Sequence, residues 1–530
     1  YVIKAYNDNK PYDRFVQEQI AGDELFPGDP DALTALGYLR HWIYEYNNRD
    51  ARGQWENILN DITDTTGDVF LGAGMQCARC HDHKFDPILQ RDYYALRSFF
   101  NNTVPVEDRI AWTEAQATEH GRQRAKWEAE TKAIRDEIDA LELKYRETAT
   151  RKAVEIFPDD VQAMINKPAA QRTPYEEQVA ALAWRQVDYE YNRLDRFIKG
   201  EASVKHADLK RKLAEHDKLK PVEPPYVLAV RETGAQGLDA VIPKKNTVVP
   251  PAFLTVLSTQ YPAPPESITP MADGTSTGRR ATLARWLTDK SNPFTARLAM
   301  NRLWQLCFRR GLTPYASDFG NLGEPPTHPE LLDFLAQRLS KSSWKLKALH
   351  REIVLSQAYQ QSADFNESAV RIDKDARLLW RFPPRRLRAE EIRDTMLATA
   401  GQLKLEPMGG PGFRLYRYLV NNVSTYIPLD APGPETYRRS VYHQNARASV
   451  VDVLNDFDLP DIAFGSPKRA NTTSPLQALT LLNNGFTLDM AKAFAARLDG
   501  PDPIAQAYLF ALQRQPTSTE RAAAEKLLAQ

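Results

Sequence analysis

A long seam of apolar and aromatic residues constrains the fold of this chain more than any other feature. It lies in residues 111–220, a stretch of dense charge with almost no glycine. The seam residues recur at intervals of four and three: Trp127, Thr131, Ile134, Ile138, Leu141, Tyr145 and Thr148. This spacing is typical of helices that pack side by side. A second run follows after a polar connection, at Val187, Tyr191, Leu194 and Ile198. We therefore predict a long antiparallel helical hairpin, a coiled coil, over 111–220.

For this hairpin we favour a spacer with a solvated outer face over an arm that docks a partner. The face opposite the seam is densely charged, as is typical of a helix surface in contact with water. The histidines in or near the hairpin are His120, His206 and His216. We expect all three to be exposed to solvent.

The segments on either side of the hairpin differ in composition. Residues 1–110 and 278–530 carry apolar residues at helical spacing, and the Pro-rich residues 221–277 carry β-branched runs at 226–230, 241–243 and 248–251. Proline cannot donate to a strand ladder, so these runs favour short or edge strands. The predicted fold class is mainly α. It comprises a helical domain at 1–110, the hairpin at 111–220, an extended linker at 221–277 and a helical C-terminal domain at 278–530.

Bulk composition excludes several classes of function. The 530 residues include 69 Lys plus Arg and 69 Asp plus Glu, so nothing predicts long-range attraction to nucleic acid or to an anionic membrane. No stretch of this chain approaches the roughly 18 apolar residues of a transmembrane segment. The length allows roughly two to four domains.

The motif that carries chemistry is Cys77-Ala78-Arg79-Cys80-His81. Two thiols three positions apart, with a histidine directly after the second, form the attachment pattern of c-type haem. Each thiol adds to one vinyl group of the porphyrin, and the adjacent imidazole binds the iron as its proximal ligand. We therefore predict one covalent haem c per chain, held by Cys77, Cys80 and His81.

Two rival interpretations of this motif are weaker. A zinc knuckle needs a second Cys/His pair, but the only other thiol is Cys307, far along the chain. A redox dithiol of the thioredoxin type needs a strand before it and a helix after it, and residues 61–71 do not show that pattern clearly. The haem interpretation is therefore preferred, with dithiol and metal chemistry as alternatives.

The motif and its flanks resemble the planctomycete cytochrome c-like domain. The matching residues are Gly74-Met75-Gln76-Cys77-Ala78-Arg79-Cys80-His81-Asp82-His83-Lys84-Phe85-Asp86-Pro87 and Arg91-Asp92-Tyr93-Tyr94, with Phe15-Val16-Gln17-Glu18-Gln19-Ile20-Ala21-Gly22-Asp23 and Asp64-Thr65-Thr66 upstream. The C-terminal block resembles the planctomycete domain of unknown function that is usually fused behind it. Its motifs are Asn301-Arg302-Leu303-Trp304, Ser317-Asp318-Phe319-Gly320, His328-Pro329-Glu330-Leu331-Leu332-Asp333, Arg438-Arg439-Ser440-Val441-Tyr442 and Asn471-Thr472-Thr473-Ser474-Pro475-Leu476-Gln477-Ala478-Leu479.

This resemblance spans nearly the whole chain except the hairpin. It implies a haem protein of the bacterial envelope, often associated with polysaccharide-degrading gene sets, but no settled activity. The cytochrome half begins inside its domain here, so we expect its first helices and an export signal to precede Tyr1. Because haem is attached to such motifs outside the cytoplasm, the expected location is the periplasm, the cell envelope or the extracellular space.

The sixth iron ligand decides the functional class. Met75 and His83 are too close in sequence to the motif to reach the opposite face of the ring easily. The remaining candidates, His328, His350 and His443, require the two blocks to pack together, and His328 is preferred because it precedes a helix start. An open sixth position is an equal alternative. Two strong axial ligands would favour electron transfer, whereas an open position would allow peroxide or small-ligand chemistry.

Several carboxylates near the motif have two interpretations. In an open site Asp82, His83 and Asp86 would be candidate acid–base catalysts at the haem edge. We favour instead a hydrogen-bond network that holds the attachment loop. Asp61 and Asp64, three residues apart, are expected to cap a helix rather than bind a cation.

The C-terminal block is rich in arginine and contains several tryptophans. The arginines are Arg381, Arg385, Arg386, Arg388, Arg393, Arg438 and Arg439. We expect ion pairs with Glu390, Glu391 and Asp394, with a pocket for a sulfated or carboxylated sugar as the alternative. Trp304, Trp344 and Trp380 could provide a stacking surface for carbohydrate, although burial is the commoner role of tryptophan.

These features lead to three functional hypotheses. The first is a mono-haem c-type protein that transfers electrons to a redox partner protein or acts with a polysaccharide or sulfated-glycan substrate. The second is a haem-dependent oxidative enzyme, either peroxidase-like or carbohydrate-oxidising. The third is a structural subunit of an oligomeric envelope assembly, with the hairpin as its connector.

Overall fold

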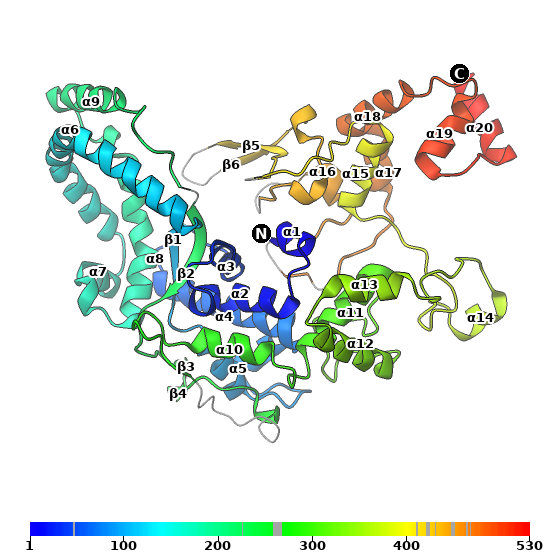
Figure 1. Cartoon of the computed structure of the whole chain (residues 1–530), viewed down its shortest axis with the longest axis horizontal. Coiled ribbons are helices and arrows are strands. Elements are labelled where there is room, and N and C mark those ends of the chain that lie inside the picture. Colours follow the sequence, from blue (N-terminus) through cyan, green and yellow to red (C-terminus); the bar gives the residue numbers. More distant parts are fainter. Residues whose placement is uncertain are drawn as a thin grey trace. The chain divides into compact units, whose positions relative to one another are not determined.

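The computed structural model describes residues 1–45, 48–224, 226–257, 268–409, 412–419, 425–429, 431–446, 451–462, 465–466 and 468–529. Helices account for 54% of the chain and strands for 6%, so the predicted mainly-α class is confirmed. The chain divides into two compact units, Tyr1–Pro383 and Pro384–Gln530. Figure 1 shows the elements of both units, which we describe separately.

The first unit contains helices of very different length. They are α1 (Val2–Asn7), α2 (Tyr12–Leu25), α3 (Pro30–Ala35), α4 (Ala51–Thr66), α5 (Gln90–Arg97), α6 (Glu114–Val154), α7 (Asp159–Asn166), α8 (Pro174–Tyr191), α9 (Glu201–Ala214), α10 (Arg279–Leu287), α11 (Thr295–Phe308), α12 (Pro329–Lys341), α13 (Leu346–Val354) and α14 (Glu367–Ile372). Proline at the first position of α12 has no N–H to leave unpaired, which explains why the helix begins there.

The strands of the first unit form two antiparallel ribbons. β1 (Thr103–Ile110) pairs with β2 (Tyr226–Glu232), and β3 (Ala240–Ile242) pairs with β4 (Thr247–Val249). Thr103 lies opposite Glu232, and the register shifts between Val106 and Arg109. β2, β3 and β4 fall within the runs predicted as extended. β1 lies in a region that we expected to be helical, so that part of the prediction was wrong.

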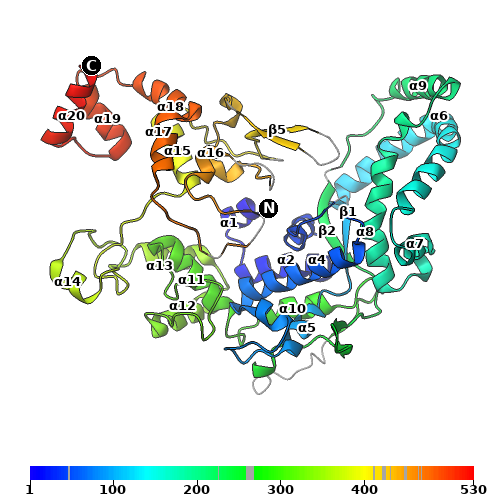
Figure 2. The same cartoon turned by 180° about the vertical axis from the view of Figure 1, so that it is seen from behind.

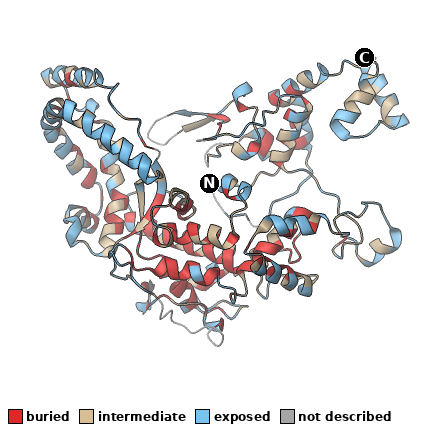
Figure 3. Ribbon diagram, viewed as in Figure 1, coloured by how far each residue is buried: buried red, intermediate tan, exposed pale blue. Residues whose placement is uncertain are grey.

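One hydrophobic core joins the beginning of the chain to residues far along it. It contains Val16 and Ile20 of α2 and Trp55 of α4, together with Leu283 of α10 and Leu339 of α12. Figure 3 shows the buried residues concentrated on α2, α4, α5 and α10, and Figure 2 shows these helices together from behind. Residues 1–104 and 279–354 therefore belong to one packed body. The four sequence segments were defined by composition rather than by contacts, and their boundaries stay a prediction.

A buried ion cluster lies where α2, α10 and β2 meet. The Arg280 side chain is fully buried and lies 2.8 Å from Asp23, 2.9 Å from Glu24 and 3.6 Å from Glu232. The second oxygen of Glu232 accepts hydrogen bonds from the backbone N–H and hydroxyl of Thr277. Buried charges are stable only when they are paired in this way, so the cluster fixes how these three segments pack.

The predicted helical hairpin is present as α6 packed against α8 and α9 (Figure 1). α6 begins with a capping box in which Thr113 and Gln116 satisfy each other's backbone N–H groups. The seam residues Thr131 and Ile138 are buried, and Trp127 and Tyr145 are half-buried. Thr148, the last seam residue, is exposed. The heptad spacing therefore predicted most of the packed face correctly.

One prediction for the hairpin was wrong. His206 is buried rather than exposed, and its Nε2 lies 2.7 Å from Oε1 of Glu142 in α6. Glu142 is buried as well and also receives Arg146. The contact pins α9 to α6, because a buried carboxylate needs hydrogen-bond donors around it. His120 and His216 are only partly exposed, and His120 packs edge-on against Trp112.

The second unit has a separate core. Its elements are α15 (Ala389–Thr399), β5 (Tyr416–Leu419), β6 (Thr425–Pro428), α16 (Asp452–Asn455), α17 (Pro475–Asn483), α18 (Gly485–Ala495), α19 (Pro503–Leu512) and α20 (Ser518–Leu528). Its core includes Leu397, Leu415, Leu454 and Phe486. None of the helices described in either unit is long and apolar enough to cross a membrane.

Candidate functional site

The predicted attachment motif begins inside the second of two irregular turns that follow α4. The chain continues into η2 (Gly67–Leu71), a π-helical turn, and then into the 3-10 turn η3 (Met75–Arg79). Gly72 lies between them with a φ of 58°, a left-handed conformation that glycine adopts at little cost. A Cβ atom at Gly72 would lie 2.7 Å from Cδ2 of Leu298 in α11. The bend before the motif therefore requires glycine.

The two thiols of the motif are presented to solvent from η3. Cys77 lies inside this turn and Cys80 is its C-terminal cap. Side chains three residues apart eclipse one another in a 3-10 helix, so this spacing favours an arrangement with both thiols on the same side. Both cysteines are exposed and neither forms a disulfide. Two free thiols on one face are what attachment to two neighbouring vinyl groups requires.

The imidazole of His81 is exposed beside the thiols, with one nitrogen occupied. Its Nδ1 lies 2.6 Å from the carbonyl oxygen of Asp82. A carbonyl oxygen can only accept, so Nδ1 donates and Nε2 keeps a lone pair for a metal. Metal-binding histidines commonly donate their second nitrogen to a carbonyl in this way. The donor set of Cys77, Cys80 and His81 therefore fits a covalent haem.

The residues after the motif form a compact hydrogen-bonded loop. Oδ1 of Asp82 accepts the backbone N–H of Gln90 at the start of α5. Nδ1 of His83 accepts the N–H of Asp86 at 2.9 Å and lies 3.3 Å from that residue's Oδ2. The side chains of His83 and Asp86 are 5% and 8% exposed. All three side chains thus hold the loop, while their assignment as acid–base catalysts stays a prediction.

A second loop, residues 316–321, clamps the attachment segment on both sides. The N–H of Phe319 donates to the carbonyl of Gly72 at 2.7 Å. The backbone N–H of Asn321 donates to Oδ1 of Asp86 at 2.6 Å, and its side chain donates to the carbonyl of Phe85 at 2.8 Å. A methyl group on Gly320 would overlap Oδ2 of Asp86. The motif around Asp318 therefore supports the motif around His81 directly.

Carboxyl groups of α4 and η2 lie next to this segment. Asp61 and Asp64 are inside the last turns of α4, whose N-cap is Asp50, so the prediction that they cap a helix was wrong. Oδ2 of Asp64 lies 3.6 Å from Arg79, and its Oδ1 is buried with no hydrogen-bond partner among the described residues. Burial raises the pKa of Asp64 to about 6. The pKa of Asp64 therefore lies near neutrality, as does that of Asp68 in η2.

Asp68 and Arg302 were not singled out from the sequence as functional residues. Burial, together with the neighbouring charge of Asp64, raises the pKa of Asp68 to about 7. The guanidinium of Arg302 in α11 donates to the carbonyl oxygens of Val69, Asp68 and Ala316. The guanidinium thus supplies hydrogen bonds at the end of the π-helical turn, where carbonyl groups lack partners within the helix. The sequence signal was present in the Asn301-Arg302 motif, but its partner was not visible.

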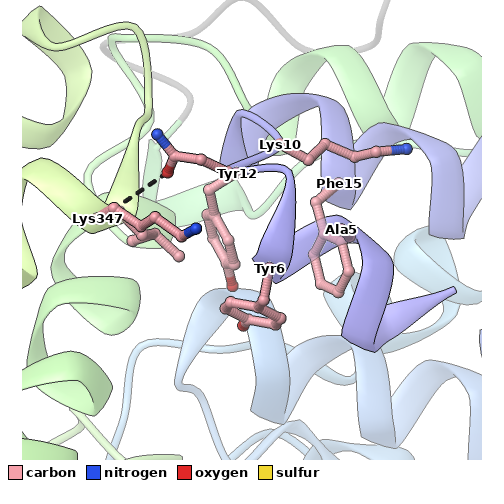
Figure 4. A pocket seen from close by; sticks show the side chains of 8 residues that line it. Ala5, Tyr6, Lys10, Tyr12, Phe15 and Lys347 are labelled. Carbon is pink, nitrogen blue, oxygen red and sulfur yellow. Dashed lines mark hydrogen bonds between the residues drawn. The ribbon is translucent and has the colours of Figure 1, made fainter. Parts of the chain in front are cut away.

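A small pocket lies nearby, between α1, α2 and the start of α13 (Figure 4). Tyr6, Tyr12 and Phe15 line one side, and Lys347 lines the other. Its volume is about 20 Å³, which is room for a single water molecule. Burial raises the pKa of Tyr12 above its ordinary value. This pocket is too small to hold a sugar or a haem.

The other histidine candidates have different surroundings. His328 is the N-cap residue of α12, and its Nδ1 lies 3.0 Å from the hydroxyl oxygen of Thr327. His350 in α13 is exposed. His443 belongs to the second unit, where burial lowers its pKa to about 4. The choice of His328 as sixth ligand stays a prediction.

Several arginines and tryptophans of the C-terminal block make contacts within the chain. Arg385 lies 3.7 Å from Glu391, and the buried Arg393 lies 3.8 Å from Asp394 and donates to backbone carbonyls. These contacts agree with the expected internal ion pairs. Trp304 and Trp344 are 6% and 4% exposed, so neither can stack on a carbohydrate at the surface. Trp380 is half-buried and donates to the carbonyl of Asp373.

The described residues contain no group of three or more His, Cys, Asp or Glu side chains that could hold a metal ion.

Two family models match the chain. One is PSD1, a protein of unknown function (DUF1553), over residues 279–528, and the other is PSCyt2, a protein of unknown function (DUF1549), over residues 1–104. These matches confirm the planctomycete-type domain pair, while the cytochrome c assignment stays a prediction. Searches of curated proteins and of solved structures gave no match.

Proposed function

We propose that this chain, with a planctomycete-type domain pair at its two ends, is a mono-haem c-type protein of the bacterial cell envelope. Its function is electron transfer, linked either to a partner protein or to a glycan-derived substrate. The observation that carries the proposal is the geometry of the motif. Cys77 in η3 and Cys80 at its C-cap are free and exposed, and His81 beside them donates through Nδ1 and leaves Nε2 available.

Each residue of the site has a defined part in this proposal. Cys77 and Cys80 would hold the porphyrin through thioether bonds, and Nε2 of His81 would ligate the iron. The bound haem would supply one-electron redox chemistry, with its potential set by axial ligation, hydrogen bonding and burial. The hydrogen bond from His81 to the carbonyl of Asp82 orients the ring. The loop around Asp86 keeps this backbone in place.

The decisive experiment is an absorbance spectrum of the full chain produced in a bacterium that attaches c-type haem. We expect a pyridine haemochrome band of c type and a mass increase of one haem per chain. Cys77→Ser and Cys80→Ser should each abolish the two-thioether adduct. Cys307→Ser, a buried cysteine of α11, is the matched control and should retain it. A chain without covalent haem under these conditions would refute the proposal.

A second candidate is a haem-dependent oxidative enzyme. The observation that favours it is the pair Asp64 and Asp68, whose pKa values are raised to about 6 and about 7. Carboxyl groups that titrate near the operating pH are suited to general acid–base catalysis. If this candidate is correct, peroxide turnover should depend on pH between these values. Asp64→Asn should then lower turnover without changing the haem content.

A further inference from the structure

The helical hairpin contains a groove that is separate from the haem-attachment segment. It runs between α6 and α8 and has a volume of about 560 Å³. On α6 it extends from Lys144 to Ala153, about 14 Å of helix, and Ile156 lines it just beyond the end of α6. Its volume falls in the range of about 300–1,000 Å³ that small-molecule sites occupy. The hairpin lies between the two regions that the family models match, residues 1–104 and 279–528.

Small side chains on α6 open this groove. Ala149 belongs to a small apolar cluster with Leu194 and Ile198, whereas Ala153 belongs to the main core. These two alanines lie one helical turn apart on α6. The small cluster therefore ends and the main core begins between Ala149 and Ala153. The floor of the groove is therefore apolar. Tyr145 and Phe197 add aromatic surface, and Phe197 is 42% exposed.

The rim of the groove carries two lysines that form no ion pair among the described residues, and the ammonium group of Lys144 lies 4.9 Å from the centre of the Tyr145 ring. Lys144 and Lys152 line it from two turns of α6 and are both exposed. Among the described residues, no carboxylate lies within ion-pair distance of either ammonium group. Most other cations of α6 are paired, for example Lys132 with Asp136 at 2.5 Å. On the opposite rim Glu190 lies 3.6 Å from Arg193, which offsets its charge.

We propose that the α6–α8 groove binds an amphipathic anion, a molecule with an aromatic or alkyl body and a carboxylate, sulfonate or sulfate group. The apolar body lies on the alanine floor between the aromatic side chains. The anionic group lies at the rim, where it meets the ammonium groups of Lys144 and Lys152. A purely polar sugar would leave the apolar floor in contact with water, and a neutral apolar molecule would leave the lysines without a counter-charge.

Two matched probes test this proposal on the full chain. Anilinonaphthalene sulfonate has an aromatic body and a sulfonate, and phenylnaphthylamine has the same body without the charge. Fluorescence titration measures the Kd of each. We expect saturable binding of the sulfonate at one site. The double variant Lys144→Gln/Lys152→Gln should raise the Kd of the sulfonate about fivefold, because exposed charge pairs contribute modestly, and should leave the Kd of the neutral probe unchanged.

Two further variants separate groove binding from general effects. Thr148→Trp places a large side chain in the groove from an exposed position and should abolish binding of both probes. Lys126→Gln/Lys132→Gln removes the same charge from another part of α6 and should change neither Kd. The proposal is overturned if this control raises the Kd of the sulfonate as much as the groove variant does. It is equally overturned if Thr148→Trp leaves binding of the sulfonate intact.

Discussion

At the scale of single residues, Glu24 is a buried carboxyl group whose ionisation opposes folding. Burial raises its pKa to about 7 from an ordinary value of 4.5, more than the charge of Arg280 lowers it. The unfolded chain therefore releases this proton at lower pH than the folded chain does. The contribution of Glu24 to the free energy of unfolding is greatest below pH 4.5 and declines until about pH 7.

We predict that Glu24→Gln removes this decline. Between pH 4.5 and about pH 7, the free energy of unfolding of Glu24→Gln should rise relative to that of the wild type by about 3 kcal/mol. Each pKa unit corresponds to about 1.4 kcal/mol. Urea unfolding of both proteins across this range measures the difference. Glu130→Gln changes an exposed carboxyl group of α6 and serves as the control. A difference between wild type and Glu24→Gln that stays constant with pH would contradict the prediction.

The range of each interaction decided which residues could be interpreted from the sequence. Cys77, Cys80 and His81 lie within five residues of one another, so the attachment motif could be recognised from its spacing alone. His206 was expected to be exposed because its partner Glu142 lies 64 residues away in the sequence. Arg302 was noted only as part of a motif, because two of the three carbonyl groups that it binds lie more than 230 residues earlier. Distant partners leave no periodic signal in a single sequence.

At the scale of elements, the loop 316–321 should control the order of the attachment segment. Oδ1 of Asp86 accepts the N–H of Asn321, and a methyl group on Gly320 would overlap its Oδ2. Gly320→Ala must therefore displace one of the two loops, at a cost of about 1–3 kcal/mol. We expect faster hydrogen exchange in residues 72–88 and faster thiol labelling of Cys77 and Cys80, measured by mass spectrometry.

Gly74→Ala is the matched control for this experiment. Gly74 lies in the same segment with a φ of −65°, and no atom lies within contact distance of the Cβ that would be added. Its exchange and labelling rates should therefore equal those of the wild type. Equal rates for Gly320→Ala and Gly74→Ala would show that the 316–321 loop does not order the motif. Both measurements are made on the haem-free chain, because thioether bonds would leave no thiol to label at Cys77 and Cys80.

Helices and strands also differed in how far the sequence could predict them. The packed face of α6 was evident from its spacing, because a helix repeats its contacts every three or four residues. β1 was missed because its partner β2 begins more than 110 residues later and only pairing makes it a strand. The contact between Phe319 and Gly72 joins two segments that the sequence placed in different domains.

At the scale of the whole molecule, the two compact units should unfold as separate cooperative transitions. Each has its own hydrophobic core: Ile20 and Leu339 belong to that of the first unit, and Leu397 belongs to that of the second. All three side chains are fully buried. Their replacement by alanine should cost about 2–5 kcal/mol in the unit that contains each one. Calorimetry of the full chain should show two transitions and reveal which one each substitution lowers.

Leu339→Ala distinguishes two ways of dividing the chain. Leu339 lies in α12, within the segment 278–530 that composition groups as one C-terminal domain, yet it packs in the core that also contains Ile20. Contacts therefore predict that Leu339→Ala lowers the same transition as Ile20→Ala and leaves the transition of Leu397 unchanged. If Leu339→Ala instead lowers the transition that Leu397→Ala lowers, the two cooperative units meet near residue 278 rather than near residue 383. In that case the support that α11 and the 316–321 loop give to the attachment motif would be a contact between domains rather than part of one core.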